Sequence, residues 1–202
     1  MQQDTANINI SDSALVQQCQ AGDPAALQRL IIKYKDRLYN VILRICRNPD
    51  DAAELTQDAF VKILENLHRF QQRSSFYTWA FRIAVNLTLN FCRRQTQRQI
   101  GSLDAEPAGN SEQAKAALRS YLADSSAPDP AAVLQNREQI ELIVKAINNL
   151  DTDHRTIIIL RDIEGMDYAQ IAQVMDVELG TVKSRLARAR ANLRANLEAI
   201  LR

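Results

Sequence analysis

Glycine is scarce in this sequence. Only Gly22, Gly101, Gly109, Gly165 and Gly180 occur in 202 residues. Each of them falls at an apparent break in the hydrophobic pattern or at a helix start, and none interrupts a periodic segment. Folds built from many short strands need frequent glycine-rich turns. The scarcity of glycine therefore favours an all-α protein.

Cysteine and histidine are also few, and their positions exclude several kinds of site. The three cysteines are Cys19, Cys46 and Cys92. Their odd number and wide spacing fit neither a zinc site nor a disulfide framework, so we expect reduced thiols in the core of a cytoplasmic protein. The only histidines, His68 and His154, have no recognisable catalytic setting. We therefore predict no catalytic residue, metal or cofactor, and an enzyme acting on DNA, such as a recombinase, is disfavoured.

Long apolar runs are absent as well. Nowhere do about eighteen apolar residues follow one another, so the sequence predicts no membrane insertion. The beginning, MQQDTANINISDS, has neither a cationic nor an apolar region typical of a secretion signal. We expect residues 1–10 to be disordered.

Charge is nearly balanced overall but unevenly distributed. The formal net charge is +1. The segment from Thr181 to Arg202, however, has six Lys and Arg against one Glu. A weak global charge with a basic end fits a local nucleic-acid surface better than nonspecific binding to polyanions.

Helical periodicity is the main pattern that is present. Apolar residues at three- and four-residue steps predict helices over about 24–45, 51–67 and 76–94, after a short helix that Ser11 can cap. The pattern fails from Gln95 to Asp129, with weak helical character near 114–122, and resumes at Ile140. The run Ile157 to Ile159 has strand propensity, but its helical flanks make an isolated strand implausible. We predict two small helical domains, 11–97 and 135–202, joined by a flexible linker over 98–134.

The stretch DYAQIAQVMDVELGTVKSRLARARANL has the spacing of a helix-turn-helix. Ala172 is the small residue where the two helices would cross. Asp176 occupies the turn position, where a left-handed backbone is needed and Asp is tolerated better than most residues. In such a motif the second helix enters the DNA major groove with its N-terminal residues.

The outward face of that second helix has the chemistry for reading a duplex. Arginine and lysine donate to guanine edges, serine reaches a base or a phosphate, and alanine touches a thymine methyl. We expect Arg185 and Arg190, which point more to the flanks, to contact phosphates. The alternative is a solvated basic helix that only packs on its neighbour. The predicted duplex-reading residues are Thr181, Lys183, Ser184, Arg185, Ala187 and Arg188.

Three stretches carry a resemblance to a known family. They are DDAAELTQDAFVKILENL, FQQRSSFYTWAFRIAVNLTLNFCRR and IEGMDYAQIAQVMDVELGTVKSRLARAR. Together they resemble regions 2 and 4 of bacterial RNA polymerase sigma factors, and more narrowly the extracytoplasmic-function (ECF), sigma-E-like group. The resemblance implies a promoter-specificity subunit that works only with core RNA polymerase, holding the −35 element as duplex and the −10 element as single strand.

The resemblance also implies where the polymerase and the −10 strand bind. Glu54, Gln57 and Asp58 share one face of a helix and would dock on the clamp coiled coil of the largest subunit, with the flap as a further contact. Without the resemblance, an acidic first turn that only complements the helix dipole is the better explanation.

A base flipped out of the −10 strand would be held by Phe70, Arg73, Ser74 and Asn86. An aromatic ring stacks on an unpaired base and an amide bonds its edge. Phe70 can instead belong to the core, together with Trp79. Family loops often carry Gly and an acidic residue after the aromatic, whereas this chain has Gln71-Gln72-Arg73, so the base preference of the pocket is open.

Two further expectations concern partners and alternatives. The resemblance implies promoter DNA and an anti-sigma factor as partners, the latter often membrane-anchored. The segment GTVKSRL also resembles the output domain of LuxR-type regulators. Those proteins carry an α/β receiver or a ligand-binding domain upstream, and no strand pattern precedes the motif here. A helical adaptor that binds DNA without sequence preference is the remaining alternative.

Overall fold

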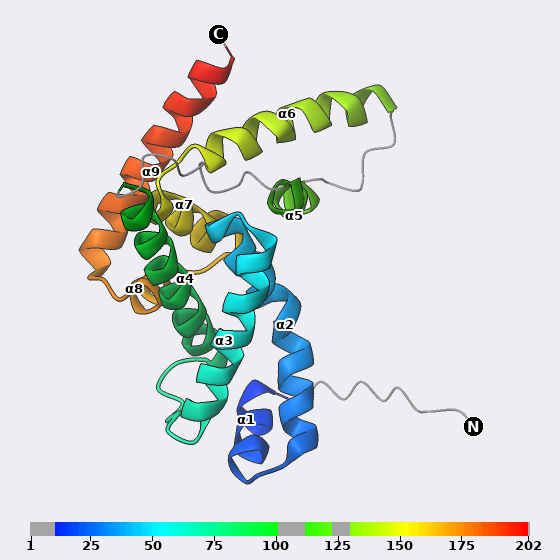
Figure 1. The fold of residues 1–202 in the computed structure, drawn as a ribbon, viewed down its shortest axis with the longest axis vertical. Coiled ribbons are helices and arrows are strands. Elements are labelled where there is room, and N and C mark those ends of the chain that lie inside the picture. The colour runs from blue at the N-terminus through cyan, green and yellow to red at the C-terminus, as the bar shows by residue number, and fades with distance from the viewer. Residues whose placement is uncertain (1–10, 101–111, 123–129, 202) are drawn as a thin grey trace.

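The computed structural model describes residues 11–100, 112–122 and 130–201, and it contains no strand within them. The predicted all-α class is therefore confirmed (Figure 1). The predicted disordered residues 1–10 and two parts of the predicted linker lie outside the described residues. The elements are α1 (Asp12–Gln20), α2 (Pro24–Cys46), α3 (Pro49–Leu67), α4 (Phe76–Ile100), α5 (Glu112–Leu122), α6 (Pro130–Asn148), α7 (Thr152–Ile158), η1 (Ile159–Ile163), α8 (Tyr168–Met175) and α9 (Leu179–Ile200).

Local caps set the helix starts in the N-terminal half. The side chain of Asp23 accepts a hydrogen bond from the Ala25 amide at 2.8 Å, and Pro24 fills the first helical position. Asn48 caps α3 in the same way, since its side chain accepts hydrogen bonds from the amides of Asp50 and Asp51. Between these helices, Arg47 ends α2 in the left-handed conformation at φ 66°. The gap between the helices predicted over about 24–45 and 51–67 is thus a C-cap followed directly by an N-cap.

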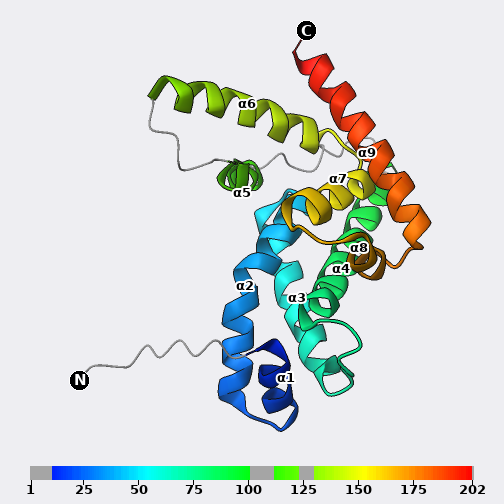
Figure 2. The same ribbon diagram turned by 180° about the vertical axis from the view of Figure 1, so that it is seen from behind.

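Helices α1 to α4 form the N-terminal half. Figures 1 and 2 show α2, α3 and α4 lying alongside one another, with α1 against the start of α2. Leu38, Ile42 and Phe81 are fully buried in the middle of this bundle. The periodic residues of the sequence therefore point inward, as the amphipathic pattern predicted.

Part of the predicted linker is helical. Helix α4 runs to Ile100 rather than ending near Arg94, and α6 already begins at Pro130. The weak helical character noted near 114–122 corresponds to α5, whose Leu118 is buried. Helix α5 packs against α2 and α6. This part of the predicted linker is therefore a docked helix rather than a flexible chain.

The C-terminal half contains a π-helical turn. The run Ile157 to Ile159 is helical, as predicted, but α7 passes directly into η1. A π turn inserts one extra residue into a helix and often occurs at functional positions. Here it ends at Glu164, whose amide donates to the Ile159 carbonyl at 2.9 Å. Helices α8 and α9 follow, and α9 extends past α7 (Figures 1 and 2).

The two halves are not separate in this structure. Buried residues from Leu15 to Ala189 form one continuous hydrophobic cluster. Helix α8 lies against α4, and α7 contacts both α2 and α4. The sequence predicted two helical halves but not this packing, and the exact domain boundaries stay a prediction.

Candidate nucleic-acid interface

The helix-turn-helix is built from local capping and one left-handed residue. Asp167 and Gln170 form a reciprocal capping box at the start of α8, with hydrogen bonds of 2.8 and 2.9 Å. Asp176 ends the helix at φ 54° and ψ 54°, so the predicted left-handed turn is confirmed. Ile171 and Val174 are buried beneath it. This arrangement fixes the angle at which α9 leaves the turn.

One side of α9 is buried and the other is open. Val182, Leu186 and Ala189 are buried, and Leu193, further along the same side, is half-buried. The residues exposed on the opposite side are Lys183, Ser184, Ala187 and Arg188. Their polar groups are bonded only along the helix, since Arg188 donates to the Ser184 carbonyl at 3.3 Å and Ser184 to the Thr181 carbonyl at 3.1 Å. Among the described residues, this face therefore makes no tertiary hydrogen bond or ion pair that a DNA duplex would need to displace.

Two other cations of α9 are turned to its flanks. Arg185 lies 3.5 Å from Asp153, and Arg190 lies 2.6 Å from Asp162. The hydrogen bond to Asp162 raises the pKa of Arg190, so its guanidinium stays charged. Thr181 is half-buried at the start of the helix. Of the six predicted duplex-reading residues, four lie on the open face and two lie beside it.

The predicted polymerase-docking residues share one exposed face of α3. Glu54, Gln57 and Asp58 are all exposed, and Glu54 lies one helical turn before the other two. The same face continues with Val61 and Leu64, whose exposed fractions are 52% and 38%. Large apolar side chains left exposed beside polar ones are typical of protein–protein interfaces. These two apolar residues were not predicted, although apolar residues on the polar face of an amphipathic pattern are a detectable signal.

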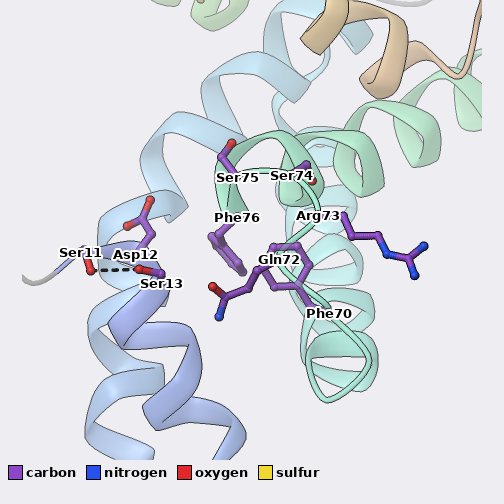
Figure 3. A pocket seen from close by; sticks show the side chains of 9 residues that line it. All are labelled: Ser11, Asp12, Ser13, Phe70, Gln72, Arg73, Ser74, Ser75 and Phe76. Atoms are coloured by element: carbon purple, nitrogen blue, oxygen red, sulfur yellow. Dashed lines mark hydrogen bonds between the residues drawn. The ribbon is translucent and has the colours of Figure 1, made fainter.

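The loop before α4 borders a hollow of about 590 Å³ (Figure 3). It brings together three of the four predicted −10 residues, Phe70, Arg73 and Ser74. The start of α1 forms its other wall, and this wall was not predicted because it comes from a distant segment. Within that wall Asp12 is fixed by Lys33 at 2.6 Å and by the Tyr34 hydroxyl. The hollow thus places acidic, aromatic and basic groups around one space.

Phe70 serves the core as well as the hollow. Its exposed fraction is 8%, and its ring centroid lies 4.8 Å from that of Trp79 and 6.1 Å from that of Phe76. The ring therefore packs inward, as the core alternative predicted, and also lines the hollow, while its role in −10 binding stays a prediction.

Asn86, the fourth predicted −10 residue, does not line the hollow. It lies on α4 ten residues beyond Phe76, which is about 15 Å along a helix. Its side-chain amide donates to the Val174 carbonyl of α8 at 3.3 Å. In this conformation Asn86 is therefore engaged by the helix-turn-helix.

The described residues hold no group of three or more His, Cys, Asp or Glu arranged for a metal. Within the described part of the chain, no helix is both long and apolar enough to cross a bilayer.

Two family models match the chain in order along its length. The model described as Sigma-70 region 2 matches residues 30–98. The model described as Sigma-70, region 4 matches residues 140–193. The first contains α3, the loop and all but the last two residues of α4, and the second contains the helix-turn-helix.

Full-length relatives match both halves together. The ECF RNA polymerase sigma-E factor of Haemophilus influenzae is 32% identical over 194 residues, covering 95% of this chain and 98% of the relative. The RNA polymerase sigma-H factor of Pseudomonas aeruginosa is 36% identical over 196 residues, with coverage of 95% and 96%. The similarity therefore extends over the whole architecture and not only over the DNA-binding motif.

Solved structures share the fold. CnrH, solved in complex with the cytosolic domain of CnrY, matches with a TM-score of 0.63 at 24% identity, covering 93% of this chain and 97% of CnrH. The sigma factor RpoE from Bartonella quintana, solved with the anti-sigma factor NepR, matches with a TM-score of 0.64 at 23% identity, with coverage of 85% and 96%.

Proposed function

This chain belongs to the ECF sigma factors of bacterial RNA polymerase. We propose that the open face of α9 and the hollow before α4 recognise the promoter, while the exposed face of α3 docks on polymerase. The chain directs promoter-specific transcription initiation together with core polymerase. A LuxR-type regulator is not supported, because the part upstream of the helix-turn-helix matches sigma region 2. The observation that carries the proposal is that one chain has both the open face of α9 and the hollow beside the loop before α4.

The −35 element is read by the open face of α9. Lys183 and Arg188 donate to guanine edges in the major groove, while Ala187 offers a methyl group to thymine. Arg185 and Arg190, at the flanks, contact phosphates and set the register of the helix on the duplex. Ser184 bonds a base edge or a phosphate beside them.

The −10 element is captured as a single strand at the hollow between the loop before α4 and the start of α1. Phe70 and Phe76 supply an aromatic wall, and Arg73 supplies a cation for the backbone. Flipping a base costs about a few kcal/mol of stacking. Asn86 joins this site only after it leaves the Val174 carbonyl, so recognition of the −10 strand involves a rearrangement of α8 relative to α4.

Polymerase docks on α3. Glu54, Gln57 and Asp58 offer acceptors to the clamp coiled coil, and Val61 supplies the apolar contact that interfaces usually need at their centre. The chain works where polymerase works, in the cytoplasm. Polymerase fixes the separation of the two halves. Once one half has bound its promoter element, the other half is therefore held at a high effective concentration near its own element, and two weak contacts together give tight binding.

An anti-sigma factor regulates this activity. Bartonella quintana RpoE was solved with the anti-sigma factor NepR, and CnrH with the cytosolic domain of CnrY. We carry this mode of regulation over to the present chain as part of the proposal. The exposed apolar residues of α3 are the surface that such a partner would compete for.

Run-off transcription with purified core polymerase on genomic DNA fragments tests the proposal. Wild type is compared with Asp58→Arg, which reverses a charge in the docking face. Asp36→Arg, the same change at an exposed acid of α2, is the control. We expect defined start sites with wild type and the control, and their loss with Asp58→Arg.

The start sites also yield the promoter sequence. If Asp58→Arg initiates like wild type, α3 is not the docking face as proposed. If no transcript forms with any variant while the chain alone binds a specific duplex at nanomolar concentration, the proposed division of surfaces is wrong.

A further inference from the structure

A nearly buried carboxylate joins the two halves of the chain. Glu164 follows η1 in the C-terminal half, and only 6% of its side chain is exposed. Its Oε2 accepts from Arg37 Nε at 2.8 Å, and its Oε1 accepts from Arg44 Nη1 at 3.2 Å. The Tyr77 hydroxyl donates to it as well, at 3.4 Å. An acid of the C-terminal half is thus enclosed by side chains of α2 and α4.

The partners of this carboxylate are themselves held in place. The guanidinium of Arg37 lies over the Tyr77 ring, 4.4 Å from its centroid, and 5.8 Å from that of Phe81. Arg44 is 9% exposed. A buried charge is stable only where its partners are oriented toward it, and removing one partner leaves the others desolvated and unpaired.

The π turn delivers Glu164 to this position. Its amide bonds the Ile159 carbonyl, and the next residue, Gly165, has φ +70°. The extra residue of the turn rotates the end of the helix, so that the carboxylate points to α2 and the chain continues into α8. Helix propensity alone does not explain a π turn at an interface contact, since such turns are rare.

A second contact between the halves involves Asn86, one of the predicted −10 residues. The Asn86 amide donates to the Val174 carbonyl in the last turn of α8, where helix carbonyls lack partners of their own. Asn86 is half-buried there. The open face of α9 takes no part in this packing, because Lys183, Ser184 and Arg188 remain exposed.

We propose that the free chain is self-masked: Glu164 latches the helix-turn-helix onto α2 and α4, and this covers Asn86 while leaving the α9 reading face open. This inference rests on the proposed function of Asn86 in −10 recognition. The proposed closure affects the two promoter elements differently. The closed chain binds the −35 duplex, whereas capture of the −10 strand requires the latch to open.

The first test measures closure on the free full-length chain. Small-angle X-ray scattering and amide hydrogen exchange are compared for wild type, Glu164→Gln and the control Glu198→Gln, which changes an exposed acid near the end of α9. We expect Glu164→Gln to increase the radius of gyration and to speed exchange in residues 168–175 about ten-fold. The control should match wild type. Equal exchange in wild type and Glu164→Gln would overturn the latch.

A second variant covers the case in which Glu164→Gln does not fold. Arg37 is half exposed, with 50% of its side chain accessible, so Arg37→Gln loses a latch contact without a buried void. Faster exchange confined to residues 168–175 supports the latch. Unchanged exchange, or an increase spread equally over α1 to α3, overturns it.

The masking is tested with DNA. The probes are a single strand and a duplex taken from a start site mapped by run-off transcription. We expect Glu164→Gln to bind the strand about ten-fold more tightly than wild type and the duplex equally well. An opened chain with unchanged affinity for the strand would overturn the masking of Asn86. Because scattering and exchange need no polymerase, failure of the latch is distinguishable from failure of the proposed sigma activity.

Discussion

At the scale of single residues, a buried arginine holds the junction of the halves. Arg155 on α7 is 3% exposed. It donates to backbone carbonyls at the ends of α2 and α6, including Ile45 at 2.9 Å and Asn148 at 3.3 Å, and also to Leu150. Helix C-termini carry partial negative charge. Burial lowers the pKa of Arg155 to about 10, so it remains charged at neutral pH and complements both ends.

Replacing this arginine should strongly destabilise the fold. We expect Arg155→Met to lower the free energy of unfolding by about 3 kcal/mol, because several buried carbonyls lose their donor. Equilibrium urea denaturation measures the change, and Arg194→Met, at an exposed position of α9, is the control. A loss below about 1 kcal/mol would mean that water replaces the guanidinium without difficulty.

The cysteines should differ sharply in reactivity. Burial raises the pKa of the Cys46 thiol to about 12, and it also raises that of Cys92. Cys19 is only half-buried, and burial raises its pKa as well. Since the thiolate is the nucleophile, we expect one thiol of the native chain to react with an aromatic disulfide reagent, faster as pH rises.

Cys19→Ser should abolish the reaction of the native chain with the reagent, and denaturant should make the thiols of Cys46 and Cys92 reactive. Two rapidly reacting thiols in the native wild type would contradict the burial of Cys46 and Cys92.

At the scale of elements, local chemistry determined what the sequence could predict. The turn at Asp176 was predictable because few residues other than Gly, Asn and Asp tolerate a left-handed backbone. The buried side of α9 followed from helical spacing alone. The helix start at Pro24 followed from its cap and proline, whereas α3 begins at Pro49, two residues before its predicted start. These features depend on neighbours within about one helical turn.

Features that depend on distant segments were not predictable. The π turn at η1 serves a carboxylate whose partners lie on α2 and α4, more than eighty residues away. Asn86 was predicted by resemblance, but its bond to Val174 follows from the packing of α8 on α4. The docking of α5 likewise needs a surface that α2 and α6 provide. No periodicity within one segment encodes such contacts.

Two arginines of α9 should have different roles on DNA. Arg188 lies on the open face, so we expect Arg188→Ala to cost about 1–3 kcal/mol and to relax the preference at one base pair. Arg190 lies at the flank, so Arg190→Ala should weaken all duplexes alike and reduce the slope of log affinity against log salt by about one.

Fluorescence anisotropy on a set of base-substituted −35 duplexes, at several salt concentrations, separates the two effects. Loss of sequence preference with Arg190→Ala would reverse the assignment of face and flank.

At the scale of the whole molecule, the two halves share one core. The sequence indicated two helical domains, and the family matches fall on each of them. Buried residues nevertheless run continuously from α1 to α9. The cations Arg47 and Arg155 bridge the halves at carbonyls, and Glu164 bridges them through its carboxylate. The halves therefore lose part of their stability whenever they separate.

This coupling should be visible in calorimetry of the full chain. We expect wild type to unfold in a single transition, with a calorimetric enthalpy equal to the van't Hoff enthalpy, because neither half can unfold without exposing the surface it shares. Glu164→Gln should broaden the transition or split it, because this variant weakens the contact between the halves without changing the core of either half. Two resolved transitions in wild type would show that each half is stable alone, and the continuous core would then contribute little to cooperativity.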